Sequence, residues 1–185
     1  SGALGIKMAK PDQDVIVFVG DGSYLLHNSD IYSSVLYDKK LIIVVCDNGG
    51  HMVINRLQLA KGGKEYLCNL KEARATNLQF VDFEAHAKSM GANGETVTST
   101  SELEAAFKRA KESEKTYVIS IKTHGYEWLD GTAFWESPTL EVHSTAENKQ
   151  AYEEFLAGKK DQRNEVSCSL HSLRRWLDAD LARRY

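Results

Sequence analysis

The chain carries VIVFVGDGS at residues 15–23 and LIIVVCDNGG at residues 41–50. Both segments begin with a continuous apolar, β-branched run rather than an alternating one, which is typical of strands buried on both faces of a parallel sheet. Between them, residues 29–37 place Ile31, Val35 and Leu36 on one helical face. The order strand, helix, strand predicts a right-handed crossover that joins two parallel neighbours.

The same alternation continues toward the C-terminus. Residues 83–90 have apolar side chains at helical spacing and precede Gly91, and residues 101–104 (SELE) form a capping box before an amphipathic helix. Residues 95–98 and 117–121 read as two further strands, and a second capping box at residues 144–147 opens a helix with Gly158 behind it. The sequence therefore predicts an α/β fold, an open parallel sheet with helices on both faces in a Rossmann-like three-layer arrangement.

The composition excludes several classes of protein. The chain has 185 residues, 42% of them hydrophobic and 26% charged, and a net charge of −3, which is too balanced to indicate binding to nucleic acid or an anionic membrane. The longest apolar runs fall far short of the ~18 residues that a membrane span needs. Its three cysteines, Cys46, Cys68 and Cys168, are widely spaced and indicate neither a disulfide framework nor a zinc site. We expect a reducing, cytoplasmic compartment.

Two regions interrupt the α/β alternation. Residues 59–79 are polar and irregular, and excursions of that length in a compact domain are usually functional or disordered. Residues 159–164 resemble a linker, after which leucines recur at helical spacing beside arginines, as in an amphipathic helix that docks on the body or on a neighbouring chain. We predict an α/β domain at residues 1–158 that binds diphosphate and magnesium, then a linker and amphipathic tail at residues 159–185.

Polar residues follow the first two strands directly. Asp21 and Asn48 are 27 residues apart, a separation filled by one turn, one helix and one strand. Both side chains should therefore emerge at the carboxyl edge of the sheet, where open α/β folds bind ligands. Gly20 and Gly22 allow the backbone to approach a bound group, and the N–H groups around Gly22 and Ser23 can donate to phosphate oxygens. A helix beginning near residue 29 would add a dipole that favours anions.

The donor types at this edge suit a hard cation. One carboxylate oxygen from Asp21 and one amide oxygen from Asn48 favour Mg²⁺ over zinc, and a carbonyl from the Gly49–Gly50 turn could supply a third oxygen. Taken singly, Gly-Asp-Gly and Asp-Asn-Gly-Gly are ordinary turn sequences. Their occurrence directly after two buried strands, one crossover apart, favours a Mg²⁺–diphosphate site.

These residues resemble a known signature. Gly20-Asp21-Gly22, a gap and then Asn48 are similar to the diphosphate- and metal-binding motif of the thiamine-diphosphate enzyme superfamily that includes acetolactate synthase and pyruvate decarboxylase; Asp47 replaces the first of its two asparagines. Within the superfamily, residues 46–58 (CDNGGHMVINRLQ) and 128–136 (WLDGTAFWE) most resemble the trihydroxycyclohexane-1,2-dione hydrolases of inositol catabolism. The resemblance covers about residues 2–163.

The resemblance implies roles for individual residues. Asp21 and Asn48 would be side-chain ligands of Mg²⁺ and Gly50 a main-chain ligand. The residues implied to bind the cofactor, thiamine diphosphate, are Gly20, Gly22, Ser23, Asn48, Gly50 and His51. The chain departs from the pattern at Met52, where family members commonly have glycine. His124, just beyond the strand at residues 117–121, could face a substrate at the same edge.

The resemblance also implies an activity, the hydrolysis of a C–C bond in a cyclic polyol dione. Its substrate is a small molecule, and neither nucleic acid nor a membrane is an expected partner. In this superfamily the cofactor lies between two chains, which implies a homo-oligomer, and is activated by an aminopyrimidine-binding domain that these residues do not contain. We therefore expect a fragment of a longer enzyme, inactive alone, and assign no catalytic residue. The alternatives are an acetolactate synthase-like carboligase or decarboxylase acting on 2-oxo acids, and a non-catalytic module that binds Mg²⁺–diphosphate or a partner.

Overall fold

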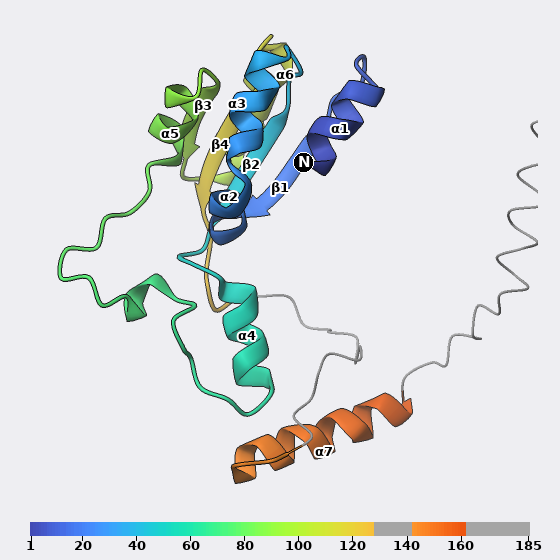
Figure 1. Ribbon diagram of the computed structural model, residues 1–185, viewed down its shortest axis with the longest axis vertical. Helices are drawn as coiled ribbons and strands as arrows, with labels where there is room; N and C mark the ends of the chain where they lie inside the picture. The colour runs from blue at the N-terminus through green and yellow to red at the C-terminus, as the bar shows by residue number, and fades with distance from the viewer. Residues whose placement is uncertain (128–141, 162–185) are drawn as a thin grey trace, which may run out of the picture. The chain divides into compact units, whose positions relative to one another are not determined.

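The computed structural model describes residues 1–127 and 142–161 (Figure 1). The chain divides into two compact units, Ser1–Leu129 and Asp130–Tyr185, and helix α7 (Ala146–Asp161) belongs to the second. The predictions for residues 128–136, for Cys168 and for the tail after residue 161 lie outside the described residues. Within the described ranges, no helix is long and apolar enough to cross a membrane.

A four-stranded parallel sheet forms the centre of the first unit. Its strands are β1 (Ile16–Gly20), β2 (Ile42–Asp47), β3 (Asn93–Val97) and β4 (Tyr117–Lys122), in the spatial order β1-β2-β4-β3. Every neighbouring pair is parallel, which confirms the predicted open parallel sheet. The register places Gly20 opposite Cys46 and Asp47 opposite Lys122, so the first three strands in this order end at one edge.

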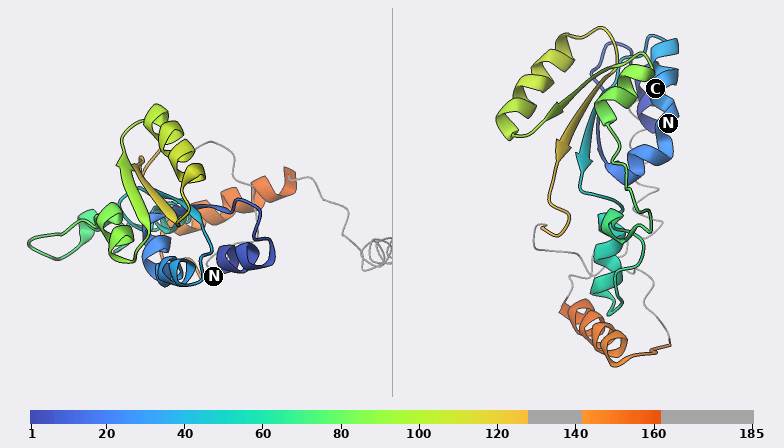
Figure 2. Two further views of the ribbon diagram at one scale, coloured as in Figure 1. Left: turned by 90° about the horizontal axis from the view of Figure 1, so that it is seen from above. Right: turned by 90° about the vertical axis from the view of Figure 1, so that its left-hand side faces the viewer.

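Helices cover both faces of this sheet, as predicted. Helices α1 (Gly2–Ala9), α2 (Asp21–His27), α3 (Ser29–Leu36) and α5 (Phe83–Ser89) pack over one face, and α6 (Thr100–Glu112) packs over the other. Figure 2 (right-hand view) shows α6 alone on its side. The larger core cluster includes Tyr24, Ile31, Ile43, Val45, Phe83 and Val118. The smaller one joins Ile42 and Ile119 to Ala106 and Ala110 of α6.

The first strand is less buried than its sequence predicts. Ile16 and Phe18 of β1 are 44% and 68% exposed, although both lie in a continuous apolar run. β1 is the edge strand, and α6 packs against β3 and β4, so the α6 side of β1 is left uncovered. The prediction of burial on both faces holds for β2, where Ile42, Val44 and Val45 are no more than 1% exposed.

The connection from β2 to α5 leaves the carboxyl edge of the sheet. Helix α4 (Met52–Ala60), which the sequence analysis did not predict, is followed by an irregular stretch that we call the return segment, residues 61–80 (Figure 1). It contains one short 3₁₀ turn, η1 (Leu70–Glu72). The return segment runs back to the loop after β2, where Gly50 and Asn69 form an antiparallel bridge. The predicted irregular excursion is therefore real, and it packs on the candidate site.

Two helix boundaries differ from the predicted ones. The capping box of α6 lies two residues earlier than predicted, since Ser99 Oγ accepts the N–H of Glu102 at 3.2 Å and Glu102 Oε2 accepts the N–H of Thr98 at 2.7 Å. At α7, Thr145 Oγ1 accepts the N–H of Asn148, and the helix continues through Gly158 to Asp161. Glycine lowers helix propensity by only about 1 kcal/mol, too little to end a helix by itself.

Candidate diphosphate and metal site

Helix α2 begins inside the Gly-Asp-Gly motif. Gly20 is its N-cap residue with extended backbone (φ −72°, ψ 156°), and Asp21 occupies the first turn. The helix predicted at residues 29–37 is confirmed as α3, but the residues before it form the short helix α2 and not only a turn. The first N–H groups of a helix have no partner within it, and those of Gly22 and Ser23 are among them. Asp21 and Gly22 are buried, whereas Ser23 is exposed.

The structure brings Asp21, Asn48 and Gly50 together from the ends of β1 and β2. Asp21 Oδ2 accepts the N–H of Gly50 at 2.7 Å, and Oδ1 accepts that of Asn48 at 3.4 Å. The loop can turn this sharply because Gly49 and Gly50 have φ values of +86° and +137°, which side-chain-bearing residues rarely adopt. A Cβ on Gly50 would also lie 2.3 Å from the carbonyl oxygen of Cys68.

The Asn48 amide reaches both of the other candidate ligands. One of its terminal atoms lies 2.9 Å from Asp21 Oδ1 and 2.9 Å from the carbonyl oxygen of Gly50. If that atom is the nitrogen, it donates hydrogen bonds to both oxygens. If it is the oxygen, three oxygens converge, and neighbouring ligands of an octahedral Mg²⁺ with bonds of ~2.0–2.1 Å also lie about 2.9 Å apart. The donor set therefore fits a hard cation when the amide turns its oxygen inward.

The site has a single carboxylate among its three candidate ligands. Elsewhere in the described parts of the chain, no cluster of three or more His, Cys, Asp or Glu side chains could hold a metal. A set of one carboxylate, one amide and one carbonyl leaves part of an octahedral shell for phosphate oxygens and water, which is how Mg²⁺ is commonly bound.

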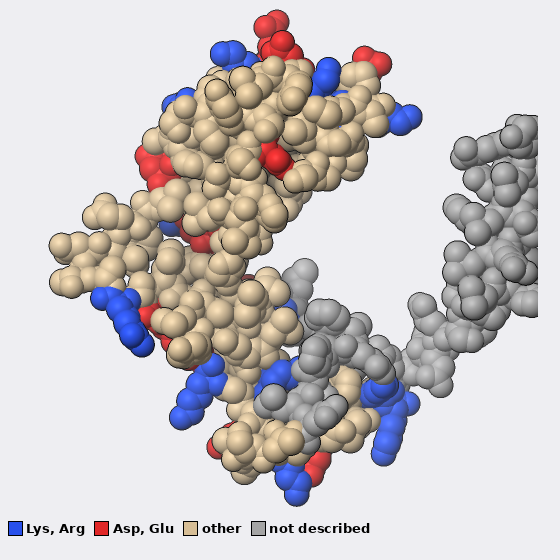
Figure 3. Space-filling view, viewed as in Figure 1, with Lys and Arg blue, Asp and Glu red and all other residues tan. Residues whose placement is uncertain are grey.

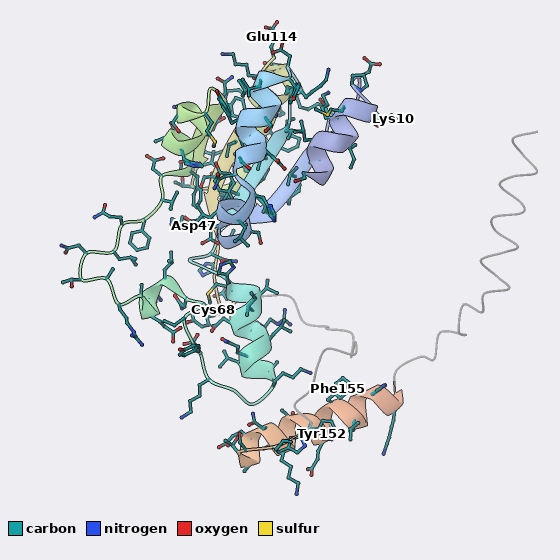
Figure 4. All side chains as sticks on the ribbon, in the orientation of Figure 1. Lys10, Asp47, Cys68, Glu114, Tyr152 and Phe155 are labelled. Carbon is teal, nitrogen blue, oxygen red and sulfur yellow. The ribbon has the colours of Figure 1, made fainter. Side chains whose placement is uncertain are left out.

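Asp21 is held in an environment that disfavours its charge. Burial raises the pKa of its carboxyl, the N–H groups of Gly50 and Asn48 oppose the rise, and the charge of Asp47 adds to it. Asp47 is itself buried and forms an ion pair with Lys122 of β4, while its Oδ1 accepts the N–H of Gly49 at 3.3 Å. Asp47 lies at the carboxyl end of β2 (Figure 4). The sequence analysis missed Lys122; the strand register that pairs it with Asp47 was the missing information.

His51 and Met52 contact glycines of the surrounding loops. The His51 ring lies against Gly22, since a Cβ there would be 2.6 Å from its Nδ1, so the residue predicted to be near the diphosphate does adjoin the Gly-Asp-Gly motif. Met52 is 4% exposed and packs on Gly125, where an added Cβ would be 3.1 Å from its Cε. The absence of a side chain at Gly125 therefore leaves room for the side chain of Met52.

The return segment is fastened over this loop by polar contacts that the sequence analysis did not identify. Tyr126 Oη donates to Glu65 Oε1 at 2.7 Å and accepts from Asn69 Nδ2 at 2.6 Å, and Asn55 Nδ2 of α4 donates to the same Glu65 oxygen at 2.6 Å. The bonds from Tyr126 and Asn55 hold the pKa of Glu65 below its usual value. His124, the predicted substrate-facing residue, lies in the same turn after β4 and is 79% exposed.

Over residues 1–121, the sequence matches the family described as thiamine pyrophosphate enzyme, C-terminal TPP binding domain. The chain belongs to this family. The predicted resemblance to thiamine-diphosphate enzymes is thereby confirmed, and so is thiamine diphosphate as the cofactor of this domain family.

The curated relatives that match this chain include trihydroxycyclohexane-1,2-dione hydrolases. The 3D-(3,5/4)-trihydroxycyclohexane-1,2-dione hydrolase of Halalkalibacterium halodurans is 36% identical over 155 residues, which cover 83% of this chain and 24% of that protein. The enzyme of the same name from Shouchella clausii is 33% identical over 165 residues, with coverage of 89% and 26%. The chain thus spans about a quarter of the length of the curated relatives it matches.

A solved structure supports the fold. The thiamine diphosphate-dependent 4-hydroxybenzoylformate decarboxylase of Rhodococcus jostii RHA1 superposes with a TM-score of 0.58 at 24% identity, covering 66% of this chain and 22% of that one. At this identity the likeness concerns the fold alone, and it agrees with the parallel α/β sheet described above.

Proposed function

We propose that this chain is the magnesium- and diphosphate-binding portion of a thiamine-diphosphate enzyme that hydrolyses a C–C bond of a cyclic 1,2-dione. The observation that carries this proposal is the convergence of Asp21, Asn48 and Gly50, in which one terminal atom of the Asn48 amide lies 2.9 Å from Asp21 Oδ1 and 2.9 Å from the carbonyl oxygen of Gly50. With the amide oxygen turned inward, this spacing suits the ligands of one Mg²⁺. The choice of reaction is supported by the 33–36% identity to trihydroxycyclohexane-1,2-dione hydrolases. The resemblance also implies a role in inositol catabolism, and the widely spaced cysteines are consistent with a cytoplasmic location.

The residues of this chain bind and orient in this proposal. Bound thiamine diphosphate supplies the carbanion chemistry. Asp21, Asn48 and Gly50 hold the metal, which neutralises the diphosphate, while the N–H groups of Gly22 and Ser23 donate to its oxygens. Gly20 lets the backbone turn into α2, and the ring of His51 bounds the site beside Gly22. No described side chain receives an acid or base role.

The proposed enzyme needs the aminopyrimidine-binding domain and, by analogy with its superfamily, a second copy of the protein. The exposed surface of α2 and α3 supports such partners, because Leu25, Leu26, Tyr32 and Leu36 are between 45% and 69% exposed. Figure 3 shows few charged side chains over this face of the first unit. Apolar surface of this kind usually marks an interface. We therefore expect the isolated chain to bind the cofactor weakly and to have no turnover.

Isothermal titration calorimetry tests the cofactor part of the proposal. Thiamine diphosphate should bind the purified chain in the presence of Mg²⁺ and not in EDTA. Asp21→Ala should abolish this metal-dependent heat, whereas Asp12→Ala, an exposed aspartate outside the site, should leave it unchanged. Binding that is equal with and without Mg²⁺, or unaffected at Asp21, would refute the proposed metal site.

The reaction is tested on the full-length protein that contains this segment. Ring opening of the trihydroxycyclohexane-1,2-dione without release of CO₂ supports the hydrolase. Release of CO₂ from a 2-oxo acid would instead identify a decarboxylase or carboligase of the acetolactate synthase type. A full-length protein that binds Mg²⁺ and diphosphate but turns over neither compound would be a non-catalytic module.

A further inference from the structure

Tyr24 joins helix α2 to helix α5 in the core of the first unit. The residue is 3% exposed, and its ring meets the rings of Phe83 and His86 edge-on, with centroids 5.1 Å and 5.6 Å apart. Tyr24 Oη and His86 Nδ1 are hydrogen-bonded at 2.9 Å, across 62 residues of sequence. Among residues 1–127 and 142–161, His86 Nδ1 is the one hydrogen-bond partner of Tyr24 Oη. The proposed function gives neither residue a role.

We propose that His86 is a positioning residue for the metal ligand Asp21, that it acts through Tyr24, and that it must be neutral to do so. The inference rests on the proposed function, because it takes Asp21 as a ligand of the metal that holds the diphosphate. It goes further by assigning the placement of that ligand to two side chains outside the site, and by making cofactor binding depend on the protonation of one of them.

Tyr24 and Asp21 are neighbours on helix α2. They are three residues apart, a spacing at which helical side chains lie on the same face, and each is 3% exposed. Because α2 has only seven residues, the contacts of Tyr24 fix the rotation of the whole helix. Asp21 meets the loop after β2 through the N–H of Gly50 at 2.7 Å. Mg²⁺ demands near-ideal octahedral geometry with short bonds, so a small displacement of Asp21 lowers the affinity for the metal.

The bond between Tyr24 and His86 has a preferred direction. Burial raises the pKa of Tyr24 to about 12, so the phenol keeps its hydrogen and needs an acceptor. Nδ1 of a neutral imidazole can accept that hydrogen, whereas a protonated imidazole has two N–H donors and no acceptor. Protonation of His86 therefore leaves a buried O–H group without a partner, which costs free energy. Moving the phenol toward water lowers this cost and displaces Asp21 with it.

His86 is placed to change its charge near neutral pH. It is half-buried, and histidine is the side chain that ordinarily titrates between pH 5 and 8. Helix α2 faces it through Tyr24, and its other titratable groups are Asp21 and His27. The other ionisable side chains of α5, and those of β3 and β4, against which α5 packs, have partners of their own; they are Asp82, Glu84, Lys88, Glu95, Tyr117 and Lys122. None of these groups pairs with His86 in the described part of the chain, so the bond to Tyr24 is the contact that protonation disturbs.

Isothermal titration calorimetry of the 185-residue chain with thiamine diphosphate and Mg²⁺, at about pH 7.5 and about pH 5.5, tests the proposal. The diphosphate itself gains a proton in this range, so wild type and variants share that part of the pH effect. Beyond the shared effect, wild type should bind about fivefold more weakly at the lower pH, the ratio expected for the loss of one hydrogen bond.

Two variants separate the parts of the proposal. Tyr24→Phe cannot donate, so it should bind about fivefold more weakly than wild type at the higher pH and show only the shared pH effect. His86→Asn keeps an acceptor near the position of Nδ1 but cannot be protonated. It should bind like wild type at the higher pH and also show only the shared effect. The matched controls are Tyr32→Phe and His27→Asn, which change an exposed phenol of α3 and an exposed imidazole of α2 and should behave as wild type does.

Nitrogen-15 NMR of the metal-free chain gives a readout that does not depend on the cofactor. At the higher pH the His86 ring should carry its proton on Nε2 and accept at Nδ1, and a proton on Nδ1 would overturn the proposal. Thermal melts of the metal-free variants separate positioning from folding. A Tyr24→Phe chain that melts near wild type and binds the cofactor more weakly supports positioning. If Tyr24→Phe does not fold, the pH dependence of wild type against that of His86→Asn decides.

The outcomes distinguish this inference from the proposed function. If wild type shows Mg²⁺-dependent binding but Tyr24→Phe binds equally well, or His86→Asn keeps the pH dependence of wild type, the positioning role is wrong and the proposed function stands. If wild type binds no thiamine diphosphate in the presence of Mg²⁺ at either pH, the proposed function fails, and this inference fails with it.

Discussion

The coupling energy between Asp47 and Lys122 should be large enough to measure in a double-mutant cycle. Asp47 is buried at the carboxyl end of β2, and Lys122 is its cross-strand partner on β4. Lys122→Met removes the counter-charge and leaves a buried carboxylate that still accepts the N–H of Gly49. Leaving such a group short of a partner costs about 1–3 kcal/mol. Because the Lys122 side chain is 69% exposed, water can replace part of its contact with Asp47. We therefore expect Lys122→Met to lower the free energy of unfolding by about 1 kcal/mol, the lower end of this range.

The partner variant should behave differently. Asp47→Asn keeps the shape and removes the buried charge, so Lys122 then loses only an ion pair from an exposed position, at a cost of about 0.5–1 kcal/mol. Once residue 47 is neutral, Lys122→Met no longer leaves a buried carboxylate without its counter-charge. The double variant should therefore be about as stable as Asp47→Asn alone. The two changes should therefore be non-additive by about 1 kcal/mol.

Urea denaturation followed by circular dichroism gives the four free energies of unfolding for this cycle. The matched control is Glu104 and Lys108 of α6, an ion pair at 2.9 Å in which both side chains are 72% exposed. Because water screens this pair on all sides, its coupling energy should be clearly smaller than that of Asp47 and Lys122. If the Asp47 and Lys122 changes add to within about 0.3 kcal/mol, Lys122 does not neutralise Asp47 and our account of the electrostatics beside Asp21 is wrong.

Three further changes test the packing around the sheet. Thr116→Val removes a buried hydroxyl that accepts a backbone N–H at 3.1 Å and bonds a serine hydroxyl at 2.6 Å, so urea unfolding should show a loss of about 1–3 kcal/mol; an unchanged midpoint would contradict this. Burial raises the pKa of Glu95, but bonds from Arg109 and Tyr117 outweigh it and leave the pKa lowered. Above pH 4.5, the free energy of unfolding of the wild type should therefore exceed that of Glu95→Gln by about 1 kcal/mol. This difference should disappear as the pH falls through the lowered pKa of Glu95, which thermal melts from pH 7 to 3 would show. Gly22→Ala puts a Cβ 2.6 Å from the His51 ring and should cost about 1–3 kcal/mol, and adding His51→Ala should recover at least half; no recovery would mean that the ring is not the obstacle.

Most of the fold follows from local sequence patterns. Each of the four strands was predictable because apolar runs bounded by turn residues are a local signal. The exposure of Phe18 was not predictable, because an apolar run does not show whether a strand lies at the edge of its sheet. It also does not show which strands of the sheet α6 packs against. The capping box of α6 was displaced by two residues because residues 99–104 (STSELE) offer two overlapping serine–glutamate pairs at the required spacing. Only the geometry selects Ser99 and Glu102.

The candidate site, like the fold, was predictable from the sequence only in part. Asp21, Asn48 and Gly50 were predictable as neighbours, because parallel strands one crossover apart end at the same edge. Lys122 was not, because it lies 75 residues from Asp47 and the two meet only once β4 is placed between β2 and β3. The contacts of Glu65 with Tyr126 are equally non-local. A sequence motif therefore identifies the loop that binds the metal, while the charges and walls around it depend on strand order.

The strand order also explains why a second acid is tolerated beside Asp21. For a carboxyl whose pKa is raised in the folded state, ionisation above that pKa lowers the free energy of unfolding, so the buried charge of Asp21 costs stability at neutral pH. An unpaired Asp47 next to it would add to that cost. Because β4 lies next to β2, Lys122 is opposite Asp47 and neutralises it, which leaves Asp21 as the carboxylate without a cationic partner among the described residues of the loop. A divalent cation shared with a diphosphate supplies the missing positive charge, and the same binding would stabilise the fold.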